Sequence, residues 1–190
     1  MNIREQIAQF VPFNEQEKAD QKNILALMDQ YDDIFYRSNE IAHMTASAWV
    51  TNRTHDKVLM AYHRIYDSWA WLGGHCDGDE DCLAVALKEV REESGVQDVR
   101  PLSEELFSLE VLSVDSHIKK GKYVPTHLHL NVSYLLEADE EETLRIKEDE
   151  NSGVAWFGLE EVFERSTEGW FKQNIYKKLN EKLRIYDENN

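Results

Sequence analysis

Residues Gly74 to Val96 read GHCDGDEDCLAVALKEVREESGV and decide how the rest of the chain is interpreted. Apolar residues recur within this stretch at helical spacing, which predicts a helix with one apolar stripe: Leu83, Ala84, Leu87 and Val90. The acidic residues 79–81 suit the first turn of that helix, and Gly95 suits its C-terminal end.

Three glutamates of this helix are predicted to share one face, since Glu89, Glu92 and Glu93 are spaced at i, i+3 and i+4. Carboxylates about 4 Å apart repel by about 1 kcal/mol in water and by about 4 kcal/mol at an effective dielectric constant of ~20. A hard divalent cation removes that repulsion, and a donor set of oxygens favours Mg²⁺ or Mn²⁺. Taken alone, the three glutamates also fit a solvated acidic helix face.

The stretch resembles the Nudix box, G-x5-E-x7-R-E-U-x-E-E-x-G-U with U aliphatic. Gly74, Glu80 and the segment KEVREESGV (88–96) stand in register with it, and Lys88 is the one departure at a fixed position. So many fixed positions in one window make the resemblance specific. It implies an enzyme that uses a divalent metal to hydrolyse nucleoside diphosphates linked to another moiety, with metal ligands Glu89, Glu92 and Glu93.

Lys88 stands where the family has an arginine that braces the catalytic glutamates. Lysine keeps the charge and reaches Glu92 at i+4, but it lacks the planar fork of a guanidinium. We therefore expect Lys88 to act as a weaker brace. Arg91 is the substitute brace to consider, although it projects from another side of the helix.

The remaining pattern predicts an α/β fold. Strand signals and turn residues alternate after residue 41, with a final helix predicted over 167–185. Predicted strands cover residues 45–51, 57–63, 69–72, 105–118, 123–136 and 153–157, the fourth and fifth as one long hairpin. Residues 41–190 are thus expected to form a Nudix-type α/β/α sandwich with a mixed sheet.

Residues 1–40 are predicted to be an N-terminal helical extension outside that domain. Ile3, Ile7 and Phe10 follow helical spacing, and Asn14 suits a helix cap ahead of Glu17. The extension either packs on the domain or supplies a homodimer interface.

Composition limits the partners. The formal net charge of −16 argues against a nucleic-acid polymer, because binding its phosphates requires clustered Lys and Arg, and favours a small-molecule diphosphate bound through metal. No signal-peptide pattern and no run of 18 apolar residues is present, so neither export nor a membrane location is expected. Two cysteines, Cys76 and Cys82, suit a reduced, cytoplasmic protein.

Further candidate residues lie outside the motif. His127, His129 and Asn131 alternate with apolar residues and are predicted to share a polar strand face, as a cleft wall for a phosphorylated ligand, a two-histidine metal site or an exposed face. Trp71, with Trp69 and Tyr66 nearby, is either a core residue or a stacking platform for a base.

The resemblance also places an acidic general base in the loop before the strand that contains Trp156. Glu150 is the first choice for this role and Glu148 the second. In the mechanism it implies, metals on the three helix glutamates bridge phosphate oxygens and lower the pKa of water, and Glu93 or Glu150 takes the proton. Lys88 supports the glutamates.

Two alternatives remain open. Isopentenyl-diphosphate isomerases share a Nudix-like fold and use a cysteine and a histidine beside the glycine, and Gly74-His75-Cys76 has those residue types in a different order. A catalytically silent ligand-binding module is the second alternative, with Lys88 as its support. The complete glutamate set favours hydrolysis over both.

Overall fold

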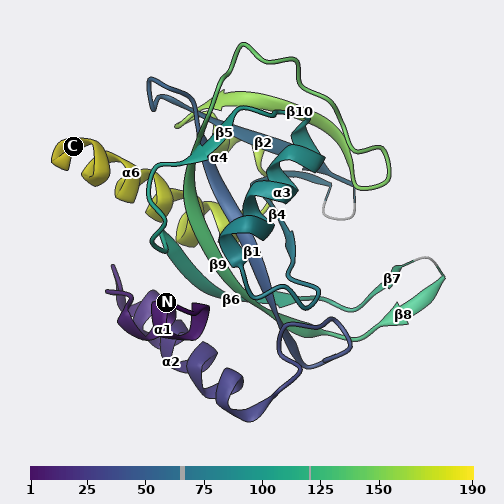
Figure 1. The fold of residues 1–190 in the computed structure, drawn as a ribbon. Coiled ribbons are helices and arrows are strands. Elements are labelled where there is room, and N and C mark those ends of the chain that lie inside the picture. Colours follow the sequence, from purple (N-terminus) through teal and green to yellow (C-terminus); the bar gives the residue numbers. More distant parts are fainter. Residues whose placement is uncertain (65–66, 120) are drawn as a thin grey trace. The chain divides into compact units, whose positions relative to one another are not determined.

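The computed structural model describes residues 1–64, 67–119 and 121–190, and Figure 1 traces the fold through them. Within these ranges the elements follow in the order α1 (Ile3–Gln9), α2 (Glu15–Gln30), β1 (Ala42–Thr51), β2 (Lys57–His63), β3 (Ser68–Ala70), β4 (Leu72–His75), α3 (Cys82–Ser94), β5 (Val99–Pro101), β6 (Ser108–Val114), β7 (His117–Lys119), β8 (Lys122–Val124), β9 (His127–Ala138), β10 (Asn151–Gly158), α4 (Val162–Arg165), α5 (Gly169–Phe171), the π-helical turn η1 (Lys172–Tyr176) and α6 (Lys177–Asn189).

The strands of the main sheet are hydrogen-bonded in the order β10-β2-β1-β9-β5, with β3 beside β2, β4 beside β1 and β6 beside β9. The hairpin of β7 and β8 forms a separate sheet. The chain comprises two compact units. The first unit contains residues 1–47, 73–86 and 104–134, and the second contains residues 48–72, 87–103 and 135–190.

Helix α2 covers the edge of β6 in the first unit. One side of β6 pairs with β9, from Ser108 opposite Ser133 to Val114 opposite His127. On the other side, the Val111 amide donates to the Asp20 carboxylate at 3.0 Å, and the Leu109 carbonyl accepts from the Gln16 side chain at 3.3 Å. An unpaired strand edge invites pairing with other chains, and α2 satisfies this one.

The N-terminal extension therefore packs on a strand of its own unit, in line with the expectation that it packs on the rest of the chain. The Asn14 side chain accepts from the Glu17 amide at 2.9 Å, which confirms the predicted cap of α2. Helix α2 ends at Gln30, so residues 31–40 are not helical and that part of the prediction is wrong. The boundary at residue 40 and a homodimer interface both remain predictions.

The long hairpin predicted over 105–136 is divided into two ladders. Strand β6 pairs with β9, while the short strands β7 and β8 pair with each other. Pro125 lies between β8 and β9 and has no N–H to donate, which explains why one ladder does not continue into the other.

In the second unit β10 and β3 flank β2, and both pairings are antiparallel. Strand β2 has the predicted bounds. The core around them includes Trp49, whose ring stacks on Tyr176 of η1 at 5.5 Å, together with Leu179 and Leu183 of α6. The single helix predicted over 167–185 is instead α5, η1 and α6 in succession, and the π-helical turn buries both Ile175 and Tyr176.

Candidate active site

Helix α3 holds the glutamates between two defined ends. The Asp81 side chain accepts from the Ala84 amide at 3.0 Å and thereby caps the helix, which begins at Cys82, three residues later than predicted. At the other end Gly95 has φ of +80°, and its amide donates to the Arg91 carbonyl at 3.0 Å. A left-handed residue at this position favours glycine, so the predicted C-terminal end is confirmed.

The buried face of α3 differs from the predicted apolar stripe. Ala84 is exposed and Leu83 and Leu87 are only half-buried. The buried apolar residues of α3 are Cys82, Val85, Ala86 and Val90. The glutamates divide in the same way, because Glu89 and Glu93, one turn apart, are 9% and 3% exposed, whereas the Glu92 side chain is 41% exposed.

The structure brings Glu150 to the two buried glutamates. Glu89, Glu93 and Glu150 each offer a carboxylate oxygen, and these oxygens lie within 4.8 Å of one another. Glu150 immediately precedes β10, and the side chain of its neighbour Asn151 donates to the Glu93 carbonyl at 2.8 Å. This hydrogen bond ties the start of β10 to the end of α3 and so positions Glu150 beside the helix. Glu148 is exposed on the same turn and is not a member of the group.

Lys147 is a site residue that the sequence interpretation missed. Its ammonium lies 3.0 Å from Glu150, 3.1 Å from Glu92 and 3.9 Å from Glu89. Desolvation lowers the pKa of Lys147, but its hydrogen bonds to Glu150 and Glu92 outweigh this effect and raise the pKa overall. The ammonium thus remains charged and compensates the carboxylates. A single lysine three residues before Glu150, in the acidic run Lys147-Glu-Asp-Glu150, was the available signal.

Lys88 makes a much weaker contact than Lys147. Its ammonium lies 3.8 Å from Glu92, and its side chain is 64% exposed. Arg91 is also turned away from the carboxylates, since its guanidinium donates to the Val99 carbonyl at 3.5 Å. Within the described part of the chain, the cation that contacts the most of these glutamates is therefore Lys147.

The donor set fits a hard divalent cation. Burial raises the pKa of Glu89; Lys147 opposes this effect and Glu92 reinforces it, so the charged form of this carboxylate is disfavoured unless a further cation compensates it. Oxygen ligands without nitrogen or sulfur are those that Mg²⁺ and Mn²⁺ prefer. Glu89, Glu93 and Glu150 would hold such an ion, with Glu92 at the exposed side of the cluster.

The other predicted substrate-binding residues have separate surroundings. The half-buried Trp71 ring packs edge-on against Phe171 at 6.3 Å and Tyr176 at 6.2 Å, within the second unit. Tyr66 lies outside the described residues. His127 and His129 belong to the first unit, together with His43, which the sequence interpretation did not select, and His75, which it considered only for isomerase-like chemistry.

The polar face predicted on β9 is more buried than expected. Asn131 is 1% exposed, and its side chain bonds Thr45, Ser47 and Glu110 at 2.8–3.0 Å. This residue is therefore part of a buried polar network, and its prediction as a cleft wall is wrong. His127 is also buried, whereas His129 is partly exposed.

Comparisons with known proteins agree with this geometry. The Nudix domain model matches residues 42–179. The RNA pyrophosphohydrolase of Pelagibacter ubique (strain HTCC1062) is 29% identical over 119 residues, which are 61% of this chain and 74% of that protein.

Solved structures with a similar fold include a Nudix-family hydrolase from Clostridium perfringens, with a TM-score of 0.55, 19% identity, and coverage of 76% of this chain and 97% of that one. The C. elegans Ap4A hydrolase in a binary complex has a TM-score of 0.54 and 17% identity, covering 77% of this chain and 98% of that one. These likenesses confirm the expected α/β/α sandwich with a mixed sheet, and the family match confirms the resemblance found in Gly74–Val96. The chain therefore belongs to the Nudix hydrolase family.

Proposed function

We propose that this chain is a divalent-metal-dependent hydrolase of a nucleoside diphosphate-linked substrate or a related organic pyrophosphate. The observation that carries the proposal is the convergence of Glu89, Glu93 and Glu150 within 4.8 Å, beside the Lys147 ammonium. Two of these carboxylates are buried, and burying them is unfavourable unless a cation compensates them. A bound Mg²⁺ or Mn²⁺ supplies charge opposite the phosphate oxygens and acidifies water.

The glutamates have different roles in this proposal. Glu89 and Glu93 are buried and held by α3, so they suit fixed metal ligands, with Glu92 completing the set from its exposed position. Glu150 is the general base that we favour, because its side chain is 41% exposed and accessible to a water molecule, whereas Glu93 is 3% exposed. Lys147 compensates part of the carboxylate charge when no divalent ion is bound.

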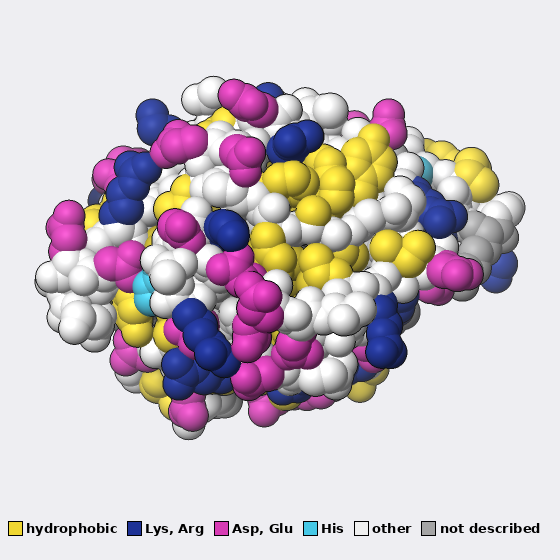
Figure 2. All heavy atoms as spheres, turned by 90° about the horizontal axis from the view of Figure 1, so that it is seen from above, with side chains coloured by type: hydrophobic (Ala, Val, Ile, Leu, Met, Phe, Trp, Pro, Cys, Tyr) yellow, Lys and Arg dark blue, Asp and Glu magenta, His cyan; other side chains and the backbone are white. Residues whose placement is uncertain are grey.

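The substrate class rests on the bond that is broken. Two of the similar proteins, an RNA pyrophosphohydrolase and an Ap4A hydrolase, both act on substrates that contain a phosphoanhydride bond. On the face that Figure 2 views, carboxylate side chains gather beside lysine and arginine side chains. With a net charge of −16, a long RNA is a poorer partner than a small nucleotide, although the 5′ end of an RNA is a second candidate.

Substrate contacts by Trp71, His127 and His129 remain predictions. The partly exposed Trp71 ring offers a face for stacking on a base, and partly exposed His129 offers a hydrogen bond to a phosphorylated ligand. Cytoplasmic location also stays a prediction, consistent with two buried free cysteines. In the described ranges, the helices are too short or too polar to cross a membrane.

A substrate panel with a metal titration tests the proposal. The panel contains nucleoside triphosphates, nucleotide sugars, dinucleoside polyphosphates, a 5′-triphosphorylated RNA and isopentenyl diphosphate, each assayed with and without Mg²⁺ or Mn²⁺. We expect metal-dependent release of a phosphomonoester from at least one small nucleotide. No turnover of any anhydride with either metal would favour a silent module and contradict the proposal.

Cys76→Ser separates hydrolysis from isomerase-like chemistry. Cys76 is 3% exposed, and its sulfur lies 3.7 Å from that of Cys82. The hydrogen bond to Cys76, together with burial, raises the pKa of the Cys82 thiol. Both sulfurs are buried, so neither is presented to a ligand. We expect Cys76→Ser to keep the rate of hydrolysis within about twofold of the parent, because attack by a metal-activated water needs no thiol.

A further inference from the structure

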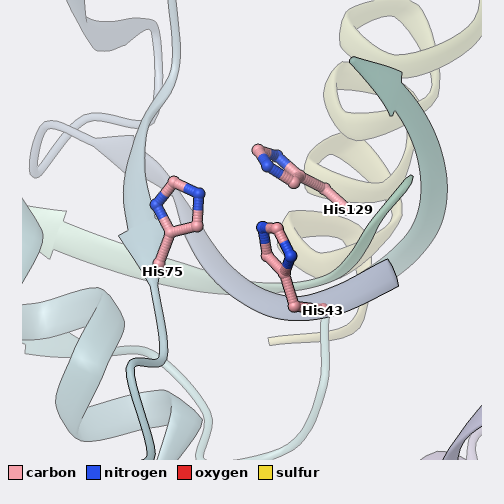
Figure 3. A group of neighbouring side chains, drawn as sticks. All are labelled: His43, His75 and His129. Carbon is pink, nitrogen blue, oxygen red and sulfur yellow. The ribbon is translucent and has the colours of Figure 1, made fainter. Parts of the chain in front are cut away.

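Four of the seven histidines of the chain gather in the first unit. They come from β1, β4 and β9, and their ring centroids lie 4.9–5.1 Å apart for each of the pairs His43–His75, His43–His127, His43–His129, His75–His129 and His127–His129. Figure 3 shows the rings of His43, His75 and His129 converging on one space from three separate strands.

Ring nitrogens of three of these residues meet at a spacing suited to one ion. His43, His75 and His129 each offer a nitrogen, and the three nitrogens lie within 4.8 Å of one another. Tetrahedral zinc with Zn–N bonds of about 2.0–2.1 Å places its ligand nitrogens about 3.3 Å apart. Small rotations of side chains that are already in contact would close the difference.

Backbone carbonyls orient two of the rings. Nδ1 of His43 lies 3.0 Å from the Asn39 carbonyl, and Nδ1 of His127 lies 2.8 Å from the Pro125 carbonyl. A carbonyl only accepts, so Nδ1 must carry the proton in each ring, which leaves Nε2 with a free lone pair when the ring is neutral. Metal-binding histidines are held in this way, with the second ring nitrogen donating to a carbonyl or carboxylate.

The lone pair of His43 has no partner. His43 is 4% exposed, and within the described ranges its buried Nε2 has no hydrogen-bond partner. Nε2 of His127 lies 3.3 Å from Nε2 of His129; with the proton of a neutral His127 on Nδ1, its Nε2 accepts from His129, which leaves Nδ1 of His129 with a free lone pair. Buried polar atoms without a partner are uncommon and call for a ligand.

All three rings are held neutral, which is the state that binds metal. Desolvation lowers the pKa of His129 to about 2 and that of His75 to about 3; neighbouring histidines and Lys119 lower both further, and Arg37 lowers that of His75. Burial likewise lowers the pKa of His43, against the effect of the Asn39 carbonyl. Arg37 itself is neutralised by Asp77, whose carboxylate accepts from the Arg37 Nε at 2.6 Å. Protons therefore do not compete for these nitrogens near neutral pH.

We propose that His43, His75 and His129 form a second metal site, specific for a zinc-class transition ion and distinct in chemistry from the glutamate site. Three imidazoles favour Zn²⁺ and its transition-metal neighbours over Mg²⁺, which prefers oxygen. Three histidines also leave a fourth tetrahedral position open for water or an anion. His127 fixes the orientation of His129 and is the reserve ligand for that position.

Ring stacking is the simpler explanation of such a cluster, and it accounts for part of the geometry. His43 and His127 stack with an interplanar angle of 28°. Stacking does not explain why the rings of His43, His75 and His129 direct nitrogens toward one another, nor why a buried Nε2 lacks a partner. An ion at the shared point explains both observations.

The test uses the full-length chain with Glu89 and Glu93 both changed to Gln, so that the glutamate site cannot compete. The metal-stripped protein is titrated with Zn²⁺ by calorimetry and with Co²⁺ by visible absorption, where tetrahedral nitrogen ligation gives intense bands. We expect one ion per chain, and His75→Gln or His129→Gln should each weaken binding by at least about 100-fold, the upper range for loss of a mere outer-shell partner.

His55→Gln is the matched control, because His55 belongs to the second unit and its Nδ1 contacts Asp187. It should bind zinc as tightly as the glutamate-depleted parent. Circular dichroism verifies that each variant is folded. His75 and His129 are changed in preference to His43 because they are partly exposed, so their substitution disturbs the fold less than substitution of the buried His43. No zinc binding by the folded parent, or equal affinity in the His75, His129 and His55 variants, would overturn the proposal. Neither result depends on hydrolase activity, so this proposal and the proposed function fail separately.

Discussion

The glutamate cluster and the histidine cluster both join side chains from distant segments, yet they differ in charge. Around Glu89, Glu93 and Glu150 the charge is negative, and Lys147 lies among the carboxylates as a compensating cation. In the histidine cluster, burial holds His43, His75 and His129 neutral, and the carbonyls of Asn39 and Pro125 orient the rings of His43 and His127. A lysine side chain moves aside readily, whereas a backbone carbonyl does not. From this difference we expect a readily exchanged hard divalent ion at the glutamate cluster and a more tightly retained zinc-class ion at the histidine cluster.

The largest expected effect comes from Glu93→Gln, which keeps the shape of the side chain and removes its charge. Turnover should fall by at least about 100-fold, the scale of losing a key electrostatic group in an active site. The rate is measured at saturating Mg²⁺ on the best substrate of the panel. Glu148→Gln is the control, since Glu148 is exposed outside the cluster and should retain full activity. Near-normal turnover of Glu93→Gln would remove Glu93 from the site.

Lys147→Gln tests whether the ammonium competes with the divalent ion. Removing a positive charge 3.0–3.9 Å from the carboxylates should tighten Mg²⁺ binding about tenfold, within the range of about 1 to 4 kcal/mol for such pairs. Apparent affinity is measured from the rise of Tm with Mg²⁺ concentration. Lys88→Gln is the matched control and should leave the affinity nearly unchanged. Weaker Mg²⁺ binding in Lys147→Gln would mean that the lysine supports the ion instead of competing with it.

The histidine cluster predicts a pH dependence of the metal-free protein. The pKa values of His75 and His129 are lowered to about 3 and about 2, below the ordinary value of 6.5. The unfolded chain therefore binds protons first, so the free energy of unfolding is highest above pH ~6.5 and falls as the pH drops toward ~3. Urea unfolding of the metal-free protein at several pH values measures this slope.

His129→Gln should flatten that slope, because one of the lowered groups is absent, while His55→Gln should keep it. Added zinc should raise the free energy of unfolding by a similar amount at each pH in this window and leave the slope unchanged, because the folded rings already carry no proton for the ion to displace. An identical slope in His129→Gln and the parent would show that His129 is not held neutral.

How far the sequence predicted the structure depended on how local the signal was. The Nudix box fixes α3, its glutamates and Gly95 within one window, and β2 was predicted from its own apolar residues after the turn at residues 52–56. The position of Lys147 beside the glutamates, and that of His43 beside His75 and His129, depend on which elements lie next to each other in the fold. No local sequence pattern specifies this. The π-helical turn η1 was missed because tertiary packing overrides the simple periodicity of its segment, whereas the break at Pro125 had a local signal, a proline without an N–H, that the predicted hairpin did not take into account.

The smallest expected effect is at Lys88, the one departure from the Nudix box. Its ammonium lies 3.8 Å from Glu92 with 64% of the side chain exposed, and exposed ion pairs contribute about 0 to 1 kcal/mol. Lys88→Ala should therefore lower turnover by no more than about fivefold. Lys88→Arg should preserve or raise it, because a guanidinium can form two hydrogen bonds with one carboxylate. The three proteins are compared at saturating metal, with circular dichroism as the check of folding.

A loss far above fivefold in Lys88→Ala would show that the side chain leaves its exposed position during turnover and acts as the strong brace of the family. No loss would transfer the bracing role to another cation. Arg91 is then the weaker candidate, because its guanidinium already donates to the Val99 carbonyl. Lys147 is the stronger candidate, because its ammonium contacts Glu89, Glu92 and Glu150 from outside the helix. Lys88, which lies within α3, contacts Glu92 alone among these glutamates in the described part of the chain.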